Sequence, residues 1–341
     1  MKTEDIKLLI LCTVSTGLDA VAEVIRRGAV VSGIIGISPE SADPIKISGW
    51  TDVGIFAKKW TIPFRYVESY SLSAEGDREI IGGLNFNLVW VSGWQRLVPQ
   101  WLINRSKLGV IGGHGSPDGI DGGRGRSPQN WAIILGCNRF DLALFCITPG
   151  VDDGPIVAER SFYYNKTDDI VISYKKASLC MGEMVSEVLQ NPDLLDKAKQ
   201  QTGKAYYYPQ RKPEDGYIDW TLPQSEIWAQ CRALTKPYPG LRSLYGGKEI
   251  IIWNCRPFDD KLTGPPGEIS FVFEDTSFLV NCRDGRVIVE LFECTENIAL
   301  SPGGSFSSVS SRMTMLRVMN RHQVKYPNQE LARRILNIDA G

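Results

Sequence analysis

Apolar and polar positions in the first part of the chain follow the pattern of strands and helices that alternate. An apolar run from Lys7 to Val14 predicts a buried strand, the turn Ser15-Thr16-Gly17 follows it, and Asp19 to Arg27 places apolar residues at helical spacing. Val30 to Ile37 is a second apolar run of strand length. This order of strand, turn, helix and strand is typical of a parallel sheet covered by helices.

The alternation continues to about residue 204. Further strands are predicted at 62–66, 87–92, 109–111, 141–148 and 154–158, and further helices at 52–59, 128–135 and 168–190. The run from Asn87 to Ser92 is almost wholly apolar, as expected of a strand covered on both faces. Residues 1–204 therefore predict an α/β domain with a Rossmann-like parallel sheet.

The pattern changes after a polar stretch at 197–213. A helix is predicted at 222–234, and short strands follow at 249–255, 267–272, 277–282 and 287–292, with a hairpin signal at Asp284-Gly285. Short strands in series favour a small barrel or sandwich within residues 205–341. Residues 301–312 are rich in Ser and Gly and predict a loop, and the end of the chain predicts helical pieces broken at Pro327.

Charge and composition narrow the class of protein. The 341 residues include 38 basic and 39 acidic side chains, for a net charge of −1. Because nucleic-acid binding takes clustered Lys and Arg, we do not expect a nucleic-acid partner. The apolar run Leu8 to Leu11 is too short for a secretory signal, and no stretch approaches the ~20 residues that span a bilayer. We therefore expect a soluble, cytoplasmic protein with no membrane partner.

The eight cysteines contain no Cys-x-x-Cys pair, so neither a zinc ribbon nor a thioredoxin-like motif is supported. Most of them lie within apolar stretches. We expect buried, reduced thiols rather than disulfides.

One of the two histidines stands in a glycine-rich segment that carries candidate chemistry. His114 lies in Gly112-Gly-His-Gly-Ser116, directly after the strand predicted at 109–111. Ligands of open α/β sheets bind at the carboxyl ends of strands, and glycines allow a substrate to approach closely. His114 is placed to act as a general acid or base. A histidine in a surface turn without a role fits the same pattern.

Two further segments carry charged groups. Pro149-Gly-Val-Asp-Asp-Gly-Pro-Ile156 places two carboxylates in a turn, where one could orient His114 or relay protons, although an ordinary Asp-Gly turn looks the same. Gly122-Gly-Arg-Gly-Arg-Ser-Pro-Gln-Asn-Trp131 opens a helix, and its arginines favour an anion such as a phosphate. A flexible, solvated loop is the alternative for this segment.

Taken in order, these segments resemble a known family. Ser92-Gly-Trp-Gln-Arg-Leu-Val-Pro99, the His114 segment, the arginine loop and Gly150-Val-Asp-Asp-Gly-Pro-Ile156 resemble the 10-formyltetrahydrofolate-dependent formyltransferases. That family includes glycinamide ribonucleotide, methionyl-tRNA and sugar N-formyltransferases. Arg211-Lys-Pro-Glu-Asp-Gly-Tyr-Ile-Asp-Trp220 and Arg232-Ala-Leu-Thr-Lys-Pro-Tyr-Pro-Gly240 resemble its segments after the catalytic domain, and the strands from 267 to 292 resemble its OB-like C-terminal domain.

The resemblance implies roles for particular residues. His114 and Asp152 correspond to the catalytic His and Asp, and 10-formyltetrahydrofolate would be the formyl donor, with no metal needed. The family Asn two positions before the His is replaced by Gly112, so Asn130 or an ordered water would substitute, or the enzyme would be slow, altered or inactive. Donor-binding residues implied are Gly93, Trp94, Gln95, Arg96, Leu97, Val98, Asp152 and Asp153. Substrate-binding residues implied are Ser15, Gly17, Gly115, Ser116, Arg124 and Arg126.

The arginine loop followed by Asn130 and Trp131 is most similar to sugar N-formyltransferases. This likeness implies a nucleotide-linked amino sugar as acceptor, a homodimer formed through the C-terminal domain, and a place in lipopolysaccharide O-antigen synthesis. Two other functions stay open at this point. One is methionyl-tRNA formyltransferase or another formyl-using enzyme such as a hydrolase, and the other is a folate-binding relative without catalysis.

Overall fold

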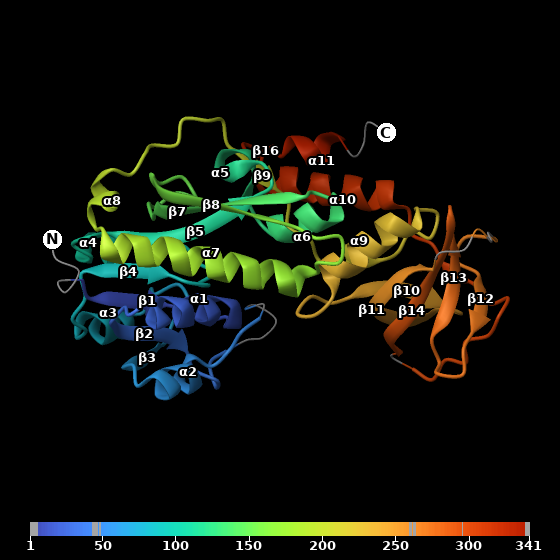
Figure 1. The fold of residues 1–341 in the computed structure, drawn as a ribbon, viewed down its shortest axis with the longest axis horizontal. Coiled ribbons are helices and arrows are strands. Elements are labelled where there is room, and N and C mark those ends of the chain that lie inside the picture. The colour runs from blue at the N-terminus through green and yellow to red at the C-terminus, as the bar shows by residue number, and fades with distance from the viewer. Residues whose placement is uncertain are drawn as a thin grey trace. The chain divides into compact units, whose positions relative to one another are not determined.

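The computed structural model describes residues 6–42, 47, 49–258, 261, 264–294 and 296–337. The chain divides into two compact units (Figure 1). The first comprises Met1–Arg124, Arg139–Tyr163 and Tyr174–Lys204, and the second comprises Gly125–Asn138, Tyr164–Ser173 and Ala205–Gly341. Residues 1–5 and 338–341, at the outer ends of the domains predicted at 1–204 and 205–341, lie outside the described ranges. The segments 125–138 and 164–173, which we predicted within the first domain, are grouped with the second unit.

The first unit is built on a seven-stranded sheet in the order β3-β2-β1-β4-β5-β7-β8. Strands β3 to β5 pair in parallel, whereas β7 pairs antiparallel with β5 and β8 pairs antiparallel with β7. The predicted α/β class with a parallel sheet is confirmed, with an antiparallel edge in addition. The strands are β1 (Leu8–Leu11), β2 (Val31–Ile37), β3 (Phe64–Val67), β4 (Leu88–Val91), β5 (Val110–Ser116), β7 (Arg139–Cys146) and β8 (Ile156–Tyr163).

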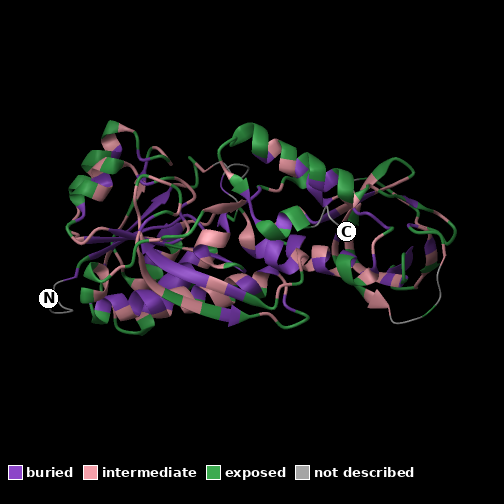
Figure 2. Ribbon diagram, turned by 90° about the horizontal axis from the view of Figure 1, so that it is seen from above, coloured by how far each residue is buried: buried purple, intermediate pink, exposed green. Residues whose placement is uncertain are grey.

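Helices join and cover these strands (Figure 1). They are α1 (Ser15–Arg26), α2 (Val53–Trp60), α3 (Glu75–Gly82), α4 (Gln100–Arg105), α5 (Gly119–Gly122), α8 (Asp193–Asp196) and, from Tyr174 onward, α7 (Ile170–Gln190). Strand β1 lies between β2 and β4, and all four of its residues have no exposed surface. An apolar run is expected there because both faces of a central parallel strand are covered. Buried residues follow the central strands in Figure 2.

Strand β5 differs from the prediction in a way that matters for the site. We predicted that the strand ends at Ile111 and that His114 follows in a loop, whereas β5 runs to Ser116 and His114 pairs with Ala143 of β7. The glycines are needed for close packing rather than for a turn. A Cβ atom on Gly113 would lie 2.1 Å from Met181 Cε, and one on Gly115 would lie 2.5 Å from the Asp141 carbonyl oxygen.

The second unit contains a six-stranded antiparallel sheet in the order β12-β13-β14-β11-β10-β15. Its strands are β10 (Leu241–Tyr245), β11 (Lys248–Phe258), β12 (Ile269–Val272), β13 (Phe278–Cys282), β14 (Gly285–Cys294) and β15 (Phe306–Ser307). The sheet curls and closes on itself, because Ile269 N donates to Gly304 O and Phe306 N donates to Gly267 O, both at 2.8 Å. The predicted barrel is therefore present, and the predicted hairpin at Asp284-Gly285 joins β13 to β14.

A small hydrophobic core of the second unit packs together elements that are distant along the sequence. It contains Trp131 of α6 together with residues of β9, α10 and α11. Residues 301–312, which we predicted as a loop, contain β15 and the start of α10, while residues 338–341 of the predicted terminal helix lie outside the described ranges. The remaining elements are β6 (Arg124–Gly125), α6 (Pro128–Ile134), β9 (Tyr206–Tyr208), the 3₁₀ helix η2 (Pro213–Gly216), α9 (Gln224–Leu234), α10 (Ser311–Lys325), β16 (Glu330–Leu331) and α11 (Arg333–Asn337).

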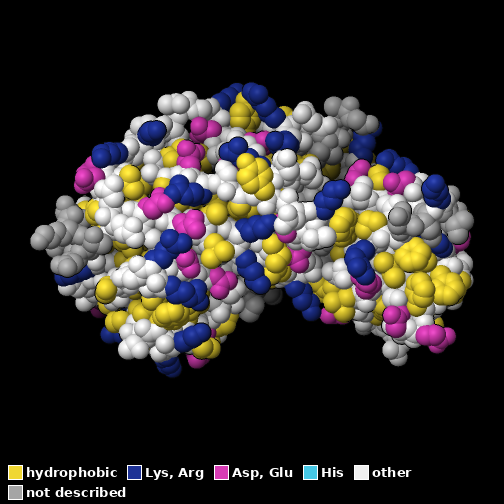
Figure 3. Space-filling view, viewed as in Figure 1, with side chains coloured by type: hydrophobic (Ala, Val, Ile, Leu, Met, Phe, Trp, Pro, Cys, Tyr) yellow, Lys and Arg dark blue, Asp and Glu magenta, His cyan; other side chains and the backbone are white. Residues whose placement is uncertain are grey.

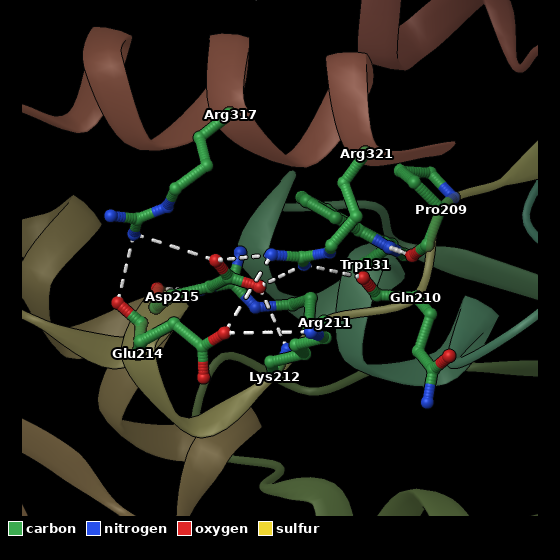
Figure 4. Close-up of polar contacts among 9 residues, drawn as sticks. All are labelled: Trp131, Pro209, Gln210, Arg211, Lys212, Glu214, Asp215, Arg317 and Arg321. Atoms are coloured by element: carbon green, nitrogen blue, oxygen red, sulfur yellow. Dashed lines mark hydrogen bonds and ion pairs between the residues drawn. The ribbon is translucent and has the colours of Figure 1, made fainter. Parts of the chain in front are cut away.

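Helix α10 is attached to η2 by an arginine cluster (Figure 4). The fully buried carboxylate of Asp215 lies 3.4 Å from Arg317 Nη2 and also pairs with Arg321, and both arginines come from α10. Arg211 donates to the Asp215 carbonyl oxygen, and its guanidinium lies 4.9 Å from the centre of the Trp131 ring. Burial lowers the pKa of Arg211 to about 10, so its guanidinium stays charged at neutral pH. These contacts link η2 to α10 and, through Arg211, to Trp131.

The surface charges, the cysteines and the length of the helices bear on predictions from the sequence. Figure 3 shows Lys and Arg side chains interspersed with Asp and Glu side chains on the face in view. The eight cysteines are free, and four of them, Cys12, Cys231, Cys255 and Cys282, are buried, whereas the other four are partly exposed. Among the residues that the structure places, no helix combines the length and the apolar character needed to cross a membrane.

Candidate functional site

His114 and Asp152 meet at the end of the first unit's sheet. His114 lies on β5. Asp152 lies in the turn that joins β7 to β8, and β7 is the strand that pairs with β5. His114 Nδ1 is 3.6 Å from Asp152 Oδ2, and the two side chains are only 12% and 24% exposed. The other ring nitrogen, Nε2, is 3.0 Å from the carbonyl oxygen of Gly123. Because a carbonyl oxygen only accepts, Nε2 carries a hydrogen, and Nδ1 is the nitrogen that faces the carboxylate.

The turn that carries Asp152 has unusual backbone geometry. Asp152 has φ of 50°, in the left-handed region that costs a non-glycine residue about 1–3 kcal/mol. Position 154 requires glycine, because a Cβ atom there would lie 1.7 Å from the Cys146 carbonyl oxygen. The neighbouring carboxylate of Asp153 accepts a hydrogen bond from the Thr148 hydroxyl instead. The structure thus brings Asp152, the first of the two predicted acids, to His114, and it directs Asp153 elsewhere.

The two arginines of the glycine-rich loop have different surroundings. Arg124 is only 8% exposed, and its Nη2 lies 3.3 Å from Asp121 Oδ1 and also donates to Gln201 Oε1. Arg126 is exposed and belongs to the second unit. The Arg124 guanidinium therefore holds loops of the first unit together, and Arg126 is the one of the pair whose side chain is presented to solvent.

The 93–98 segment, predicted to hold the formyl donor, is held in place by hydrogen bonds to Thr13 and Tyr70. Thr13 Oγ1 donates to Gly93 O at 3.0 Å, and Gln95 N donates to the hydroxyl of Tyr70 at 2.8 Å. Burial raises the pKa of Tyr70, so this hydroxyl stays protonated.

The side chains of the 93–98 segment differ in exposure. Trp94 and Val98 are buried, and the Arg96 guanidinium lies 4.8 Å from the Tyr70 ring centre. Leu97 is 58% exposed. Leu97 is thus an exposed apolar side chain of this segment, and its contact with the donor stays a prediction.

The remaining predicted substrate residues divide into exposed and packed ones. Ser15 is exposed at the first turn of α1. Gly17 is buried, and a Cβ atom there would lie 2.0 Å from Ser92 O, so Gly17 allows α1 to approach the end of β4. Ser116 is fully buried, and its hydroxyl donates to Gly119 O at 2.6 Å. Gly115 and Ser116 therefore serve the packing of β5 in this structure, and a direct contact with substrate stays a prediction.

The position of the missing family Asn is apolar. A Cβ atom on Gly112 would lie 2.6 Å from Ile147 Cδ1, so the Ile147 side chain occupies the adjoining space. Asn130, which we predicted as a substitute, lies in the second unit, is 1% exposed, and donates from Nδ2 to Ala233 O at 2.6 Å. This contact ties α6 to α9. The Nδ2 group of Asn130 is engaged in this contact, and a catalytic role for Asn130 stays a prediction.

Several functional groups at this site were not anticipated from the sequence. Gly123, Ile147, Gln201 and Tyr70 each contact a predicted residue or its neighbour. Gly123 lies in the glycine-rich segment singled out above, but its contact with His114 was not predicted. Nothing in the local sequence marks the other three, because their contacts join segments that are distant along the chain. Cys12 also lies near the start of α1, but burial raises its pKa to about 12, so its thiol is protonated and a poor nucleophile. Among the described residues, no group of three or more His, Cys, Asp or Glu could hold a metal ion.

Comparison with known proteins agrees with this architecture. Residues 211–302 match the family "Formyl transferase, C-terminal domain". HypX from Aquifex aeolicus in complex with tetrahydrofolic acid matches 96% of this chain and 48% of its own, at 18% identity and a TM-score of 0.60. The chain thus spans about half the length of the HypX chains that it matches.

Two smaller proteins match over nearly their whole length. An N-formyltransferase from Helicobacter canadensis, in complex with folinic acid and dTDP-3-aminofucose, matches 83% of this chain and 98% of its own, at 17% identity and a TM-score of 0.54. Methionyl-tRNA formyltransferase from Clostridium thermocellum matches 86% of this chain and 100% of its own, at 15% identity and a TM-score of 0.50. The chain therefore has the formyltransferase fold, in which residues 211–302 match the C-terminal domain of formyl transferases.

Proposed function

We propose that this protein transfers a formyl group from 10-formyltetrahydrofolate to the amino group of a nucleotide-linked amino sugar. The observation that carries the proposal is the pair formed by His114 and Asp152, 3.6 Å apart and mostly buried on the sheet of a formyltransferase fold. The bound folates in HypX and in the Helicobacter canadensis enzyme support the donor. The dTDP-3-aminofucose in the latter supports the acceptor class.

The residues of the site can perform the proton transfers that this reaction needs. The acceptor amine attacks the formyl carbon, a C–N bond forms, and the amine must lose a proton. His114 Nδ1 accepts that proton, and the Asp152 carboxylate stabilises the resulting imidazolium. The same proton then reaches the departing folate nitrogen as its C–N bond breaks. Leu97 offers exposed apolar surface to the aromatic donor.

The direct test is incubation with 10-formyltetrahydrofolate and a panel of nucleotide-linked 3-amino and 4-amino sugars, followed by mass spectrometry. We expect the gain of one formyl group. His114→Ala and Asp152→Asn are expected to lower kcat by at least about a hundredfold. Asp196→Asn, which changes an exposed Asp of α8, is the matched control and should retain wild-type kcat. Formylation of methionyl-tRNA but of no sugar in the panel would overturn the acceptor assignment.

A second candidate is favoured by the space beside Gly112. The apolar Ile147 side chain occupies it, and the three atoms nearest to a Cβ at Gly112 all belong to the apolar side chains of Ile147 and Val91, where the family has the amide of Asn. One lost oxyanion donor typically costs about 3 kcal/mol in the transition state. A protein that binds folate and transfers formyl groups slowly or not at all fits this feature. Folate binding by calorimetry, with no product from sugars or methionyl-tRNA, would favour this second candidate.

A further inference from the structure

Gln201 lies in the segment after α8 and contacts two loops of the first unit at once. Its Nε2 donates to Asp152 O at 2.9 Å and to Gly154 O at 2.7 Å. Its Oε1 accepts a hydrogen bond from Arg124 Nη2 at 2.5 Å. One carboxamide therefore binds two carbonyl groups within the Asp152 turn, on either side of Asp153, and a guanidinium of the glycine-rich loop.

Each of these loops orients one nitrogen of His114. The Asp152 turn presents the carboxylate that faces Nδ1 at 3.6 Å. The glycine-rich loop presents the Gly123 carbonyl that accepts from Nε2 at 3.0 Å, and Gly123 is joined by a peptide bond to Arg124. Gln201 is thus connected to both partners of the imidazole without touching the ring itself.

The surroundings of Gln201 reinforce this connection. Arg124 is only 8% exposed and also pairs with Asp121, whose second oxygen accepts from Gly203 N at 3.2 Å. The 201–203 segment therefore holds the glycine-rich loop by a side chain and by its backbone. Asp152 has a left-handed backbone, which persists only where neighbouring groups hold it in place. The two bonds from Gln201 Nε2 supply that support on either side of Asp153.

We propose that Gln201 is a positioning residue for the formyl transfer proposed above. It sets the tautomer and the orientation of His114 by holding Gly123 and Asp152 at fixed places around the ring. A hydrogen on Nε2 leaves Nδ1 as the nitrogen that exchanges a proton beside Asp152. Loss of Gln201 therefore lowers the rate of the chemical step and leaves donor and acceptor binding largely unchanged.

The test uses the full chain with Gln201→Met, which keeps the side-chain length and removes all three hydrogen bonds. Gln200→Met is the matched control, because Gln200 is the adjacent, exposed residue of the same type. The chain has only two histidines, so ¹⁵N spectra of histidine-labelled protein resolve each ring, and His114→Ala assigns the signals. We expect the Nε2–H tautomer of neutral His114 in the wild type and in Gln200→Met, and a mixture of tautomers in Gln201→Met.

In kinetics, Gln201→Met is expected to lose about tenfold or more in kcat with KM changed less than threefold, and to shift the pH profile of kcat. A Gln201→Met protein with wild-type kcat, or with the wild-type tautomer of His114, overturns the proposal. If Gln201→Met does not fold, Gln201→Glu replaces it. Glutamate keeps an oxygen for Arg124 but loses both N–H donors to the Asp152 turn, so a wild-type kcat and pH profile in Gln201→Glu overturns the proposal.

Failure of the proposed function is separable from failure of this inference. If the wild-type protein formylates no acceptor, the proposed function fails. The tautomer of His114 in the wild type and in Gln201→Met then decides the role of Gln201 by itself.

Discussion

Ile147 determines whether an amide side chain fits at position 112. The atom that lies 2.6 Å from a Cβ at Gly112 is Ile147 Cδ1, and the next is Cγ1 at 3.2 Å. Replacing Ile147 by Val removes Cδ1 alone. We predict that Gly112→Asn destabilises the protein by about 1–3 kcal/mol through overpacking, and that it costs less in an Ile147→Val background.

Urea denaturation of the two single variants and the double variant measures this coupling. Ile147→Val by itself should cost about 0.5–1.5 kcal/mol. Additive costs in the double variant would show that Ile147 does not limit position 112. A gain in turnover in the double variant alone would identify the missing amide as the reason for slow transfer.

The hydroxyl of Tyr70 supports the segment predicted to hold the donor. It accepts from Gln95 N at 2.8 Å and lies 3.1 Å from Thr13 Oγ1, which in turn donates to Gly93 O. Tyr70→Phe leaves the Gln95 amide without this acceptor, at a cost of about 1–2 kcal/mol. We predict that Tyr70→Phe weakens 10-formyltetrahydrofolate binding by about fivefold or more, measured by calorimetry.

Tyr66→Phe is the control for this prediction. Tyr66 also uses its hydroxyl, which donates to Asp52 Oδ1 at 2.5 Å between β3 and α2. It should lose stability while keeping its affinity for the donor. Equal weakening in both variants would show a general loss of order rather than support of the 93–98 segment.

At the site, the sequence predicted that Asp152 lies beside His114, and the structure places them 3.6 Å apart, but the groups that support them were not predicted. His114 and Asp152 could be paired because each stands in a segment that resembles the formyltransferase family. Gln201, Ile147 and Gly123 could not, because their roles depend on which loops come together in space. Because of the glycines around His114, we predicted that the strand ends at Ile111, whereas β5 runs to Ser116. In a sequence, a Gly that permits close packing cannot be told from a Gly that permits a turn.

Among the elements, α10 has its first backbone N–H group bound by the carboxylate of Asp219, which lies elsewhere in the second unit. Asp219 Oδ2 accepts from Ser311 N at 2.7 Å, and Oδ1 accepts from the hydroxyl of Thr221 at 2.6 Å and from that of Ser308 at 3.1 Å. Burial alone would raise the pKa of Asp219, but these hydrogen bonds outweigh it and lower the pKa below its usual value of 3.8. Asp219 therefore stabilises the folded state in its ionised form.

The sign of the pH effect follows from that lowered pKa. The stabilisation is fully present above the unfolded value of 3.8 and is lost as the pH falls through the folded value. We predict that Asp219→Asn has a lower urea midpoint than the wild type at pH 7, and that the difference shrinks toward pH 3. The exposed Asp196→Asn is the control. A difference that stays constant with pH would contradict the role of the ionised carboxylate.

Helix α6 illustrates what periodicity predicts about an element and what it does not. The apolar spacing in 128–135 predicted the helix, and the structure has it at Pro128–Ile134. The spacing indicates a buried face but not its partner. Trp131 packs with α10 and α11, and its indole N–H donates to Pro209 O at 2.9 Å, so α6 is grouped with the second unit.

For the whole molecule, the change in pattern near residue 204 predicted two parts of different character, an α/β part and a part rich in short strands. The chain's return into the second unit at 125–138 and 164–173 could not be predicted, because it rests on tertiary contacts alone. The matched C-terminal domain, 211–302, likewise accounts for only part of the second unit. Residues 303–337 add β15, α10, β16 and α11 to it.

The closure of the barrel has a consequence for any shortened form of this protein. The residues that complete it, 303–307, lie just past the matched domain and pair with β10 and with the start of β12. A chain that stops at Pro302 would leave two edge strands with unpaired N–H and C=O groups, which are templates for strand addition by other chains. We predict aggregation of residues 1–302 by light scattering, and less of it for 1–310, which also lacks α10 but keeps both edges covered. A boundary drawn from family likeness alone would thus turn a closed barrel into a self-associating sheet.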